Sequence, residues 1–354
     1  MQKTSPDIMI SCHDISVTLD GNIILDHISF DITKGSITSL LGISGSGKST
    51  LLRYMAGLVC GSSGEMHLRG EVTNNKDIIL INSAKRNIAY MFQDYALFPH
   101  KTILENVLFA DKSDTTKQDK KIEALEILKE VGLNHYQDRY PHHLSGGEKQ
   151  RLALARCLMQ KTDLVFLDEP FSNLDARLRD YLRDEILGLL HQKGKTIIMV
   201  THDPAEAMLV SDQIIYMRES KIIQSATPQE LYLAPYDYLT ALFFGAINQI
   251  QGKVTRHGLE TDLGTFPIQD VTAQNAILCL RYETFEIASK ENASLHGILQ
   301  SMSFSGAYYI CDILIESVTV TALLPMSALS GYKIGREIHL NIKPEGLFVF
   351  PVNE

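Results

Sequence analysis

The segment from Gly42 to Thr50 constrains the fold more than any other part of the chain. It reads Gly-Ile-Ser-Gly-Ser-Gly-Lys-Ser-Thr and fits the pattern G-x-x-x-x-G-K-[ST] of a phosphate-binding loop. The apolar run 37–41 predicts a strand before it, and residues 51–56 predict a helix after it. Glycines let backbone N–H groups turn toward an anion, and a helix N-terminus adds its positive dipole end. The segment therefore predicts a strand–loop–helix unit that binds a phosphate chain.

Within this loop, we expect side chains and backbone to share the binding of the phosphate chain. The candidate ATP-binding residues are Gly42, Ser44, Gly45, Ser46, Gly47, Lys48, Ser49 and Thr50. We expect Lys48 to neutralise the β- and γ-phosphates and the Ser49 hydroxyl to take a coordination position on Mg²⁺. A chance match of four fixed positions in such a chain has odds of roughly one in a hundred. The rest of the chain must therefore support the interpretation.

Length, composition and charge restrict the remaining classes. A chain of 354 residues favours two domains, and 45% hydrophobic with 21% charged residues is typical of a folded globular protein. The sequence has no apolar stretch long enough for a bilayer and no signal-peptide core near its start, so we expect no export. The five cysteines form no C-x-x-C pair, which favours buried thiols in a reducing compartment. A net charge of −9 argues against duplex nucleic acid as the main partner.

Strand-like runs alternate with helical patterns from Asp7 to about Tyr238. The predicted strands are Ile15–Leu19, Ile28–Ile32, Ile37–Leu41, Ile88–Phe92, Leu164–Leu167, Ile197–Val200 and Gln213–Met217. The predicted helices are Lys120–Val131, Glu148–Met159 and Ala176–His191. This alternation predicts an α/β fold with a largely parallel sheet that is covered on both faces.

After about Ala246 the pattern changes to short alternating runs separated by Gly, Asp and Asn, which predicts a small all-β domain. Within it, the segment Leu280–Ile287 echoes Ile342–Val349 in the order apolar, basic, any, Glu, any, apolar. Two related β units that pack into one barrel-like module would explain this weak repeat.

Two carboxylates follow the apolar run Leu164–Leu167. A buried parallel strand whose carboxyl end delivers acids to a ligand crevice has this pattern. We expect Asp168 to hold Mg²⁺ through its water shell and Glu169 to polarise the water that attacks the γ-phosphate. The alternative is an acid pair that caps the next helix.

A second glycine-rich helix start lies at Leu144–Arg151. Ser145, Gly146 and Gly147 precede a helix that is predicted to begin at about Glu148, so this N-terminus also suits an anion. Because one nucleotide needs one phosphate cradle, we expect a dimer in which the second cradle of each chain closes on the ATP of its partner. The alternative is a plain N-cap with a glycine turn.

Together these runs resemble the ATP-binding cassette (ABC) ATPases that power membrane transporters, over roughly Asp7–Tyr238. The resemblance assigns the Walker A loop to Gly42–Thr50, the Q-loop glutamine to Gln93, the signature motif to Leu144–Glu148, Walker B to Leu164–Asp168, the catalytic glutamate to Glu169, the D-loop to Ser172–Asp175 and the switch histidine to His202. It implies a P-loop NTPase cassette with a helical subdomain that carries the signature motif.

The resemblance also implies a role for each of these side chains. Gln93 contacts Mg²⁺ or the attacking water, and together with Ser49 and Asp168 it would form the Mg²⁺ site. His202 donates a hydrogen bond to the γ-phosphate. Asp175 crosses the dimer interface. Leu19 is a departure from the family, because it stands where the family places an aromatic residue that stacks on adenine.

The second domain resembles the OB-like (TOBE) regulatory domain of importers for ferric iron, polyamines, sulfate, molybdate and sugars. We expect a nucleotide-binding domain at 7–238, a linker at 239–248 and the OB-like domain at 249–354. Gln93–His100, Glu169–Asp175 and Phe243–Asn248 resemble the ferric-iron and polyamine branches, and ferric iron is the first choice. In the family, the surface near Phe98 and Pro99 receives a short helix of the permease.

These resemblances predict the ATP-hydrolysing subunit of an importer. The implied partners are a second copy of the chain, transmembrane permease subunits and, indirectly, a periplasmic or extracellular solute-binding protein. The implied location is the cytoplasmic face of the inner membrane, as a peripheral subunit. Polyamine, sulfate or molybdate, and sugar import remain alternatives.

A soluble cassette ATPase that acts on nucleic acid is a further alternative, but its usual tandem cassettes, coiled-coil insertion and basic surface are missing from this sequence. The OB-like domain has few clustered basic residues, which argues against oligonucleotide binding.

Overall fold

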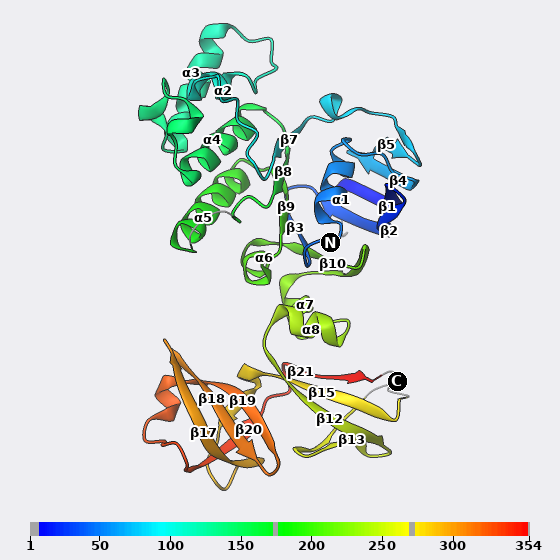
Figure 1. Ribbon diagram of the computed structural model, residues 1–354, viewed down its shortest axis with the longest axis vertical. Coiled ribbons are helices and arrows are strands. Elements are labelled where there is room, and N and C mark those ends of the chain that lie inside the picture. The colour runs from blue at the N-terminus through cyan, green and yellow to red at the C-terminus, as the bar shows by residue number, and fades with distance from the viewer. Residues whose placement is uncertain (1–6, 173–175, 269–272, 353–354) are drawn as a thin grey trace, which may run out of the picture. The chain divides into compact units, whose positions relative to one another are not determined.

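A computed structural model of the chain describes residues 7–172, 176–268 and 273–352 (Figure 1). The chain divides into two compact units, Met1–Pro228 and Gln229–Glu354, and each is described by itself. No helix within the described ranges combines the length and apolar character that a membrane span requires.

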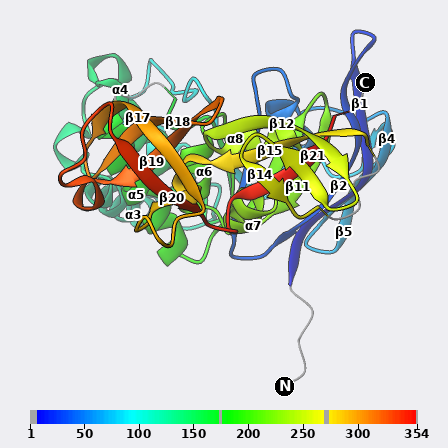
Figure 2. The ribbon, with the colours of Figure 1, turned by 90° about the horizontal axis from the view of Figure 1, so that it is seen from below.

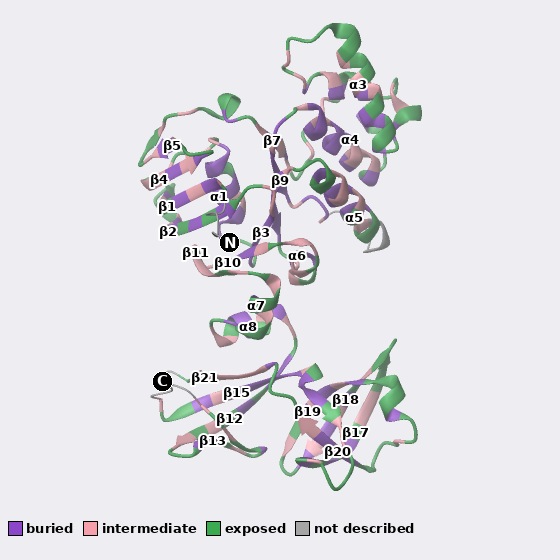
Figure 3. Ribbon diagram, turned by 180° about the vertical axis from the view of Figure 1, so that it is seen from behind, coloured by how far each residue is buried: buried purple, intermediate pink, exposed green. Residues whose placement is uncertain are grey.

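A six-stranded sheet forms the centre of the first unit. Its strands are β3 (Ile37–Leu41), β7 (Ile88–Met91), β8 (Leu164–Asp168), β9 (Thr196–Thr201), β10 (Gln213–Arg218) and β11 (Lys221–Ala226). Their order is β11-β10-β3-β9-β8-β7, and every neighbouring pair is parallel except β10 with β11. Every residue of β3, β8 and β9 is buried (Figure 3). The predicted parallel sheet is confirmed.

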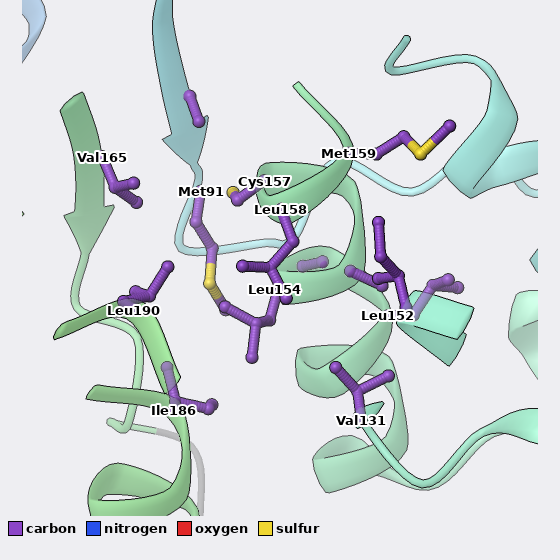
Figure 4. Close-up of a cluster of buried hydrophobic side chains, with 14 of the residues drawn as sticks. Met91, Val131, Leu152, Leu154, Cys157, Leu158, Met159, Val165, Ile186 and Leu190 are labelled. Carbon is purple, nitrogen blue, oxygen red and sulfur yellow. The ribbon is translucent and has the colours of Figure 1, made fainter. Parts of the chain in front are cut away.

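Alternate side chains of β8 face two different hydrophobic cores. Val165 and Leu167 pack with the helical side, as Figure 4 shows in part, and Leu164 and Phe166 pack on the opposite face. The helical side contains α2 (Ile103–Leu108), α3 (Lys117–Glu130), α4 (Gly146–Met159) and α5 (Ala176–Gln192). The opposite face is covered by α1 (Lys48–Met55) and by a second sheet. This two-sided burial explains the continuous apolar run of β8.

The second sheet of this unit is antiparallel, with the order β2-β1-β4-β5-β6. Its strands are β1 (Ile8–Leu19), β2 (Asn22–Thr33), β4 (Ser63–Leu68), β5 (Glu71–Asn75) and β6 (Ile78–Ile79). The assignment of the runs Ile15–Leu19 and Ile28–Ile32 to a parallel sheet is wrong. These two strands pair antiparallel through a tight turn at Asp20 and Gly21, whose φ angles are 49° and 80°.

Within the described residues, the second unit contains ten strands in two antiparallel sheets. The strands are β12 (Ile247–Thr255), β13 (Gly258–Thr261), β14 (Gly264–Phe266), β15 (Asn275–Arg281), β16 (Phe285–Ile287), β17 (Leu295–Ser305), β18 (Tyr308–Ile315), β19 (Val318–Pro325), β20 (Glu337–Ile342) and β21 (Leu347–Pro351). The sheet orders are β14-β13-β12-β15-β21 and β16-β20-β17-β18-β19. Strands β12, β15 and β21 lie side by side (Figure 2). Both sheets contribute to one core, as an OB-like domain requires.

The two echoing segments of this unit are paired with each other. Each one carries the chain from one sheet to the other, as β15 to β16 and as β20 to β21. The Arg281 N–H donates to the Gly346 carbonyl at 3.0 Å, and the Lys343 N–H donates to the Thr284 carbonyl at 2.8 Å. Because Arg281 matches Lys343 and Thr284 matches Gly346 in the echo, these contacts are reciprocal. This reciprocity fits the expectation of two related β units.

Three short helices complete the described elements that matter here. They are α6 (Pro204–Val210), α7 (Pro228–Leu233) and α8 (Tyr238–Phe244). Helix α6 follows β9, and its first turn is capped by Asp203, which accepts hydrogen bonds from the Ala205 and Glu206 N–H groups.

Candidate functional site

The glycine-rich loop joins the buried strand β3 to the N-terminus of α1. Gly47 precedes α1 with a φ of 99°, and a side chain there would lie 2.6 Å from the Ile24 carbonyl oxygen. A side chain at Gly42 would lie 2.2 Å from the Met217 carbonyl oxygen. Neighbouring backbone therefore leaves room only for glycine at these two positions. The first N–H groups of α1 remain available to an anion.

Lys48 is buried beneath this loop. Its ammonium donates to the carbonyl oxygens of Gly42 at 2.9 Å and Ile43 at 2.8 Å, and its side chain is 5% exposed. Burial lowers the pKa of Lys48, while the nearby carboxylates Glu169 and Asp168 act in the opposite direction. The positive charge of Lys48 thus lies inside the loop, close to the carboxylates of Asp168 and Glu169.

Asp168 at the end of β8 is fully engaged by two hydroxyl groups. The Ser49 hydroxyl donates to Asp168 Oδ1 at 2.9 Å, and the Tyr90 hydroxyl donates to Oδ2 at 3.1 Å. Asp168 is 2% exposed. The predicted pair of Ser49 and Asp168 is thereby brought together from residues far apart in the sequence. Tyr90 on β7 was not predicted, because an aromatic residue in an apolar strand reads as ordinary core.

Glu169 lies next to Gln93 and His202. The Gln93 amide donates to Glu169 Oε2 at 3.2 Å, and His202 Nδ1 lies 3.8 Å from the same oxygen. Glu169 has a φ of 47°, in the left-handed region, and its N–H donates to the Val200 carbonyl oxygen at 3.1 Å. Such a conformation of a non-glycine residue is typical of functional sites, where the surrounding structure holds it in place.

The predicted second cradle is the N-terminus of α4, which begins at Gly146 rather than at about Glu148. Ser145 is its N-cap. The Glu148 carboxylate accepts hydrogen bonds from both the N–H and the hydroxyl of Ser145 at 2.8 Å, and the Glu148 N–H donates to the Ser145 hydroxyl at 3.4 Å. This is a capping box. The Ser145 N–H is the main cause of the lowered pKa of Glu148. The Glu148 carboxylate therefore occupies the N–H and the hydroxyl of Ser145 at this turn.

Asp175 and Leu19 are the other two predicted positions. Asp175 lies outside the described residues. Leu19 ends β1 with 40% of its surface exposed, and the next strand contacts the loop where Ile24 approaches Gly47. The hairpin that carries Leu19 therefore borders the phosphate loop.

Arg86 is a buried residue beside the site that the sequence did not indicate. It is 1% exposed and donates to the Met55 carbonyl oxygen at 2.7 Å, to the Ile81 carbonyl oxygen at 2.8 Å and to Asn74 Oδ1 at 2.6 Å. Met55 is the last residue of α1, so the guanidinium meets the negative end of this helix dipole. Burial lowers the pKa of Arg86 to about 10. Arg86 thus fixes the far end of the helix whose first turn forms the loop.

The oxygen donors of the site fit a magnesium ion. Mg²⁺ is usually bound by one or two carboxylates together with water and substrate phosphates. Ser49, Gln93 and Asp168 offer a hydroxyl, an amide and one carboxylate. Among the described residues, no cluster of three or more His, Cys, Asp or Glu side chains suits a metal ion. If Mg²⁺ binds here, water and the phosphates of the nucleotide would complete its coordination.

A parallel sheet with a phosphate loop, a strand-end acid pair and a flanking glutamine and histidine defines a nucleotide-hydrolysing P-loop ATPase. The family model described as ABC transporter matches residues 25–172. The chain is 34% identical over 346 residues to the Fe(3+) ions import ATP-binding protein FbpC of Fusobacterium nucleatum, and the match covers 93% of this chain and 90% of that protein. The chain belongs to the ABC transporter family of ATPases.

Two further comparisons agree with this family. The spermidine/putrescine import ATP-binding protein PotA of Mesoplasma florum is 31% identical over 348 residues, covering 96% of this chain and 97% of that protein. Among solved structures, the dimeric ATP-binding cassette MJ0796, bound to ADP and Pi in a post-hydrolysis state, matches with a TM-score of 0.55 and 28% identity. This match covers 62% of this chain and 99% of that cassette. The α/β cassette fold and the ATPase class are therefore confirmed.

Proposed function

We propose that this ATPase drives import of a solute through a membrane permease, with ferric iron as the first candidate solute. The observation that carries the proposal is the convergence of Ser49, Asp168, Glu169, Gln93 and His202 on the mouth of the phosphate loop. The two importer ATPases described above resemble the chain over nearly its whole length, including the second unit.

Each residue of the site has a chemical role in this proposal. Lys48 and the N–H groups of α1 bind the β- and γ-phosphates. Ser49, Gln93 and Asp168 hold Mg²⁺, which neutralises charge on the phosphates when it is bound. Glu169 accepts the hydrogen bond of the attacking water, and His202 donates to the γ-phosphate.

A second copy of the chain completes the site. Ser145, Gly146, Gly147 and Glu148 begin α4, and we propose that this turn binds the ATP held by the partner, while Asp175 lies at the shared interface. Closure around two ATP molecules would open the permease outward, and hydrolysis would reset it. The dimeric state of the related cassette supports this arrangement.

The permease contact is proposed at the surface that follows Gln93. Phe109 is 56% exposed, and its ring lies 4.5 Å from that of Phe98. Asn106 fixes the backbone here, because it accepts from the Phe98 N–H at 2.9 Å and donates to the Phe98 carbonyl oxygen at 3.1 Å. A rigid aromatic surface of this kind suits an apolar helix from a membrane subunit. The subunit would then lie at the cytoplasmic face of the membrane.

The solute is the least determined part of the proposal. Ferric iron comes first because of the 34% identity to the Fe(3+) ions import protein, and polyamine is second at 31%. The neighbouring permease and solute-binding protein should be purified together with this chain in lipid vesicles. Ferric-loaded binding protein is expected to raise the ATPase rate, and spermidine-loaded protein is not. Stimulation by spermidine alone would reverse the order.

The ATPase cycle is tested with Glu169→Gln. The amide retains the contact with Gln93 but accepts the water proton poorly, so turnover should fall by at least about 100-fold while ATP still binds. The variant should accumulate as a dimer with ATP and Mg²⁺, as measured by size-exclusion chromatography with light scattering. A variant that binds ATP and stays monomeric would contradict the proposed dimer. Wild-type chain without ATP should remain the monomeric reference.

A further inference from the structure

A small cavity is lined in part by the candidate catalytic carboxylate, Glu169. It has a volume of about 30 Å³. The described residues that line it are Glu169, Phe171, Ser172, Arg179, Thr201, His202, Asp203 and Glu206. Roughly 10–15 Å³ is enough for one water molecule, and about 30 Å³ is the share of one molecule in the liquid. The cavity therefore has room for a single ordered water.

Glu206 is a second carboxylate beside Glu169 in this cavity, and the ATPase chemistry described above does not use it. It lies in the first turn of α6 and is 6% exposed. Its Oε2 accepts a hydrogen bond from the Thr201 hydroxyl. Within the described residues, its Oε1 is buried and has no hydrogen-bond partner. Buried carboxylate oxygens are nearly always satisfied, so this atom requires a donor.

The groups around the cavity favour a hydrogen-bond donor that contacts both Glu169 and Glu206. Glu169 and Glu206 both line it, and two carboxylates that share a small volume repel each other unless a donor lies between them. Water has two O–H groups, so it can donate to one oxygen of each carboxylate. Arg179 and His202 also line the cavity, and N–H groups of these residue types suit the lone pairs of a water.

The charges around Glu206 agree with a buried and constrained carboxyl group. Burial is the main cause of its raised pKa, and Asp203 adds to the effect. The Thr201 hydroxyl, Arg183 and Arg179 act in the opposite direction. Thr201 also accepts from the Asp203 N–H at 3.1 Å, so Glu206 braces the turn that carries His202.

We infer that this cavity binds one ordered water that donates to both Glu206 and Glu169, so that Glu206 is a positioning residue for the hydrolytic carboxylate. Glu206 does not touch the nucleotide. It fixes the second oxygen of Glu169 through the water and fixes the His202 turn through Thr201. This inference rests on the proposed role of Glu169 in hydrolysis.

The first test is a kinetic series at position 206. Glu206→Ala removes the acceptor, so kcat for ATP should fall about tenfold, while KM should change less than twofold. Glu206→Gln still holds a water through its amide, so kcat should stay within about threefold of wild type. Asp212→Asn is the matched control, because its carboxylate accepts from the Ile37 N–H at 2.8 Å near the start of β3. Its kcat should not change. Wild-type kcat in Glu206→Ala, or a parallel loss of kcat and ATP affinity, would overturn the inference.

The second test is independent of whether the variants fold. A crystal structure of the wild-type chain at better than about 1.5 Å resolution should contain density for one water between Glu169 and Glu206. An empty cavity, or a water that contacts neither carboxylate, would overturn the inference. Equal turnover by wild type and Glu169→Gln would instead refute the proposed function, and the cavity water would still be measured. The two failures are therefore distinguishable.

Discussion

Helices α1 and α4 both begin after glycine-rich turns, but different groups satisfy their first N–H groups. In α1 the N-cap is Gly47, which has no side chain to supply, and the first turn carries no acidic residue. In α4 the N-cap is Ser145, and Glu148 in the first turn closes a capping box. The α1 turn is therefore open to an external anion, whereas at the α4 turn an internal carboxylate already occupies the N–H and hydroxyl of Ser145.

This difference assigns the two turns different tasks. The α1 turn has Lys48 beneath it, so a phosphate there gains a buried positive charge as well as N–H donors. At α4, a phosphate that binds the N–H or the hydroxyl of Ser145 must first displace the Glu148 carboxylate. We therefore expect the first site to bind ATP in a single chain and the second to bind only when a partner brings its ATP close.

Removing Lys48 should have the largest effect. Lys48→Ala should weaken ATP binding by at least about 100-fold, because the loop loses a charge-assisted donor in a buried position. The change is measured by isothermal titration with ATP and Mg²⁺. Lys34→Ala is the control, since Lys34 is a surface lysine 3.5 Å from Asp7. Unchanged ATP affinity in Lys48→Ala would remove the distinction between the two turns.

Removing the α4 cap should have the next largest effect. It should weaken dimerisation and leave ATP binding by the single chain unchanged. In a Glu169→Gln background, Ser145→Ala should weaken ATP-dependent dimerisation about tenfold, because each site loses one hydrogen bond to a charged group. ATP binding to the single chain should not change. Sedimentation velocity measures the dimer. Thr116→Ala removes the equivalent cap of α3, where Thr116 accepts from the Asp119 N–H at 3.2 Å. Equal loss in both variants would mean that only helix stability is at issue.

A substitution at Leu19, the expected adenine-stacking position, should change ATP affinity less, and only at the site formed by the α1 turn. Leu19→Tyr should raise ATP affinity about threefold, because an aromatic ring stacks on a base better than an aliphatic side chain does. Triphosphate alone should bind with unchanged affinity. Ile78→Tyr, at another exposed position of the same antiparallel sheet, provides the control. A gain for ATP and triphosphate alike would place Leu19 away from the base.

The capping carboxylate should give the smallest effect, with a defined pH dependence. The pKa of Glu148 is lowered in the folded chain, so its stabilisation is complete above the unfolded pKa of about 4.3 and is lost as the pH falls through the folded value. Glu148→Gln should be less stable at pH 7 by about 0.5 kcal/mol after screening by solvent. Thermal melts should show this difference shrinking as the pH is lowered below the unfolded pKa of about 4.3. A constant difference would mean that charge is irrelevant to the cap.

The parts of the fold that the sequence predicted share one physical property. Strands such as β3 and β8 are buried on both faces, so their apolar runs are unbroken and easily recognised. Strands β4 to β6 were missed because their segment is largely polar and short. Met66 and Leu68 are buried in β4, but the residues between them and before them are polar or glycine. The separate antiparallel sheet follows from a turn at Gly21 that strand alternation alone does not specify.

The residues of the candidate site also divide into those that a local sequence pattern predicts and those that it does not. Loop residues such as Lys48 lie in one contiguous motif, and their spacing alone predicted them. Tyr90 and Glu206 reach the site, and Arg86 reaches the far end of α1, only because of strand order and helix packing, so no local pattern marks them. Helix α4 begins earlier than predicted because the Ser145 cap offsets the low helix propensity of its two glycines.

The pairing of β15 with β21 affects the order of events during synthesis. This pairing joins Ala276–Leu280 to Leu347–Pro351, so the sheet of the second unit cannot close until the ribosome has released the last of these residues. The six-stranded sheet of the first unit, by contrast, is complete once β11 at Lys221–Ala226 has emerged. Nascent chains would therefore carry a finished ATPase unit ahead of an unfinished β unit. A ribosome that stalls within the last strand would leave an ATPase with an open sheet edge, a natural target for chaperones and proteases.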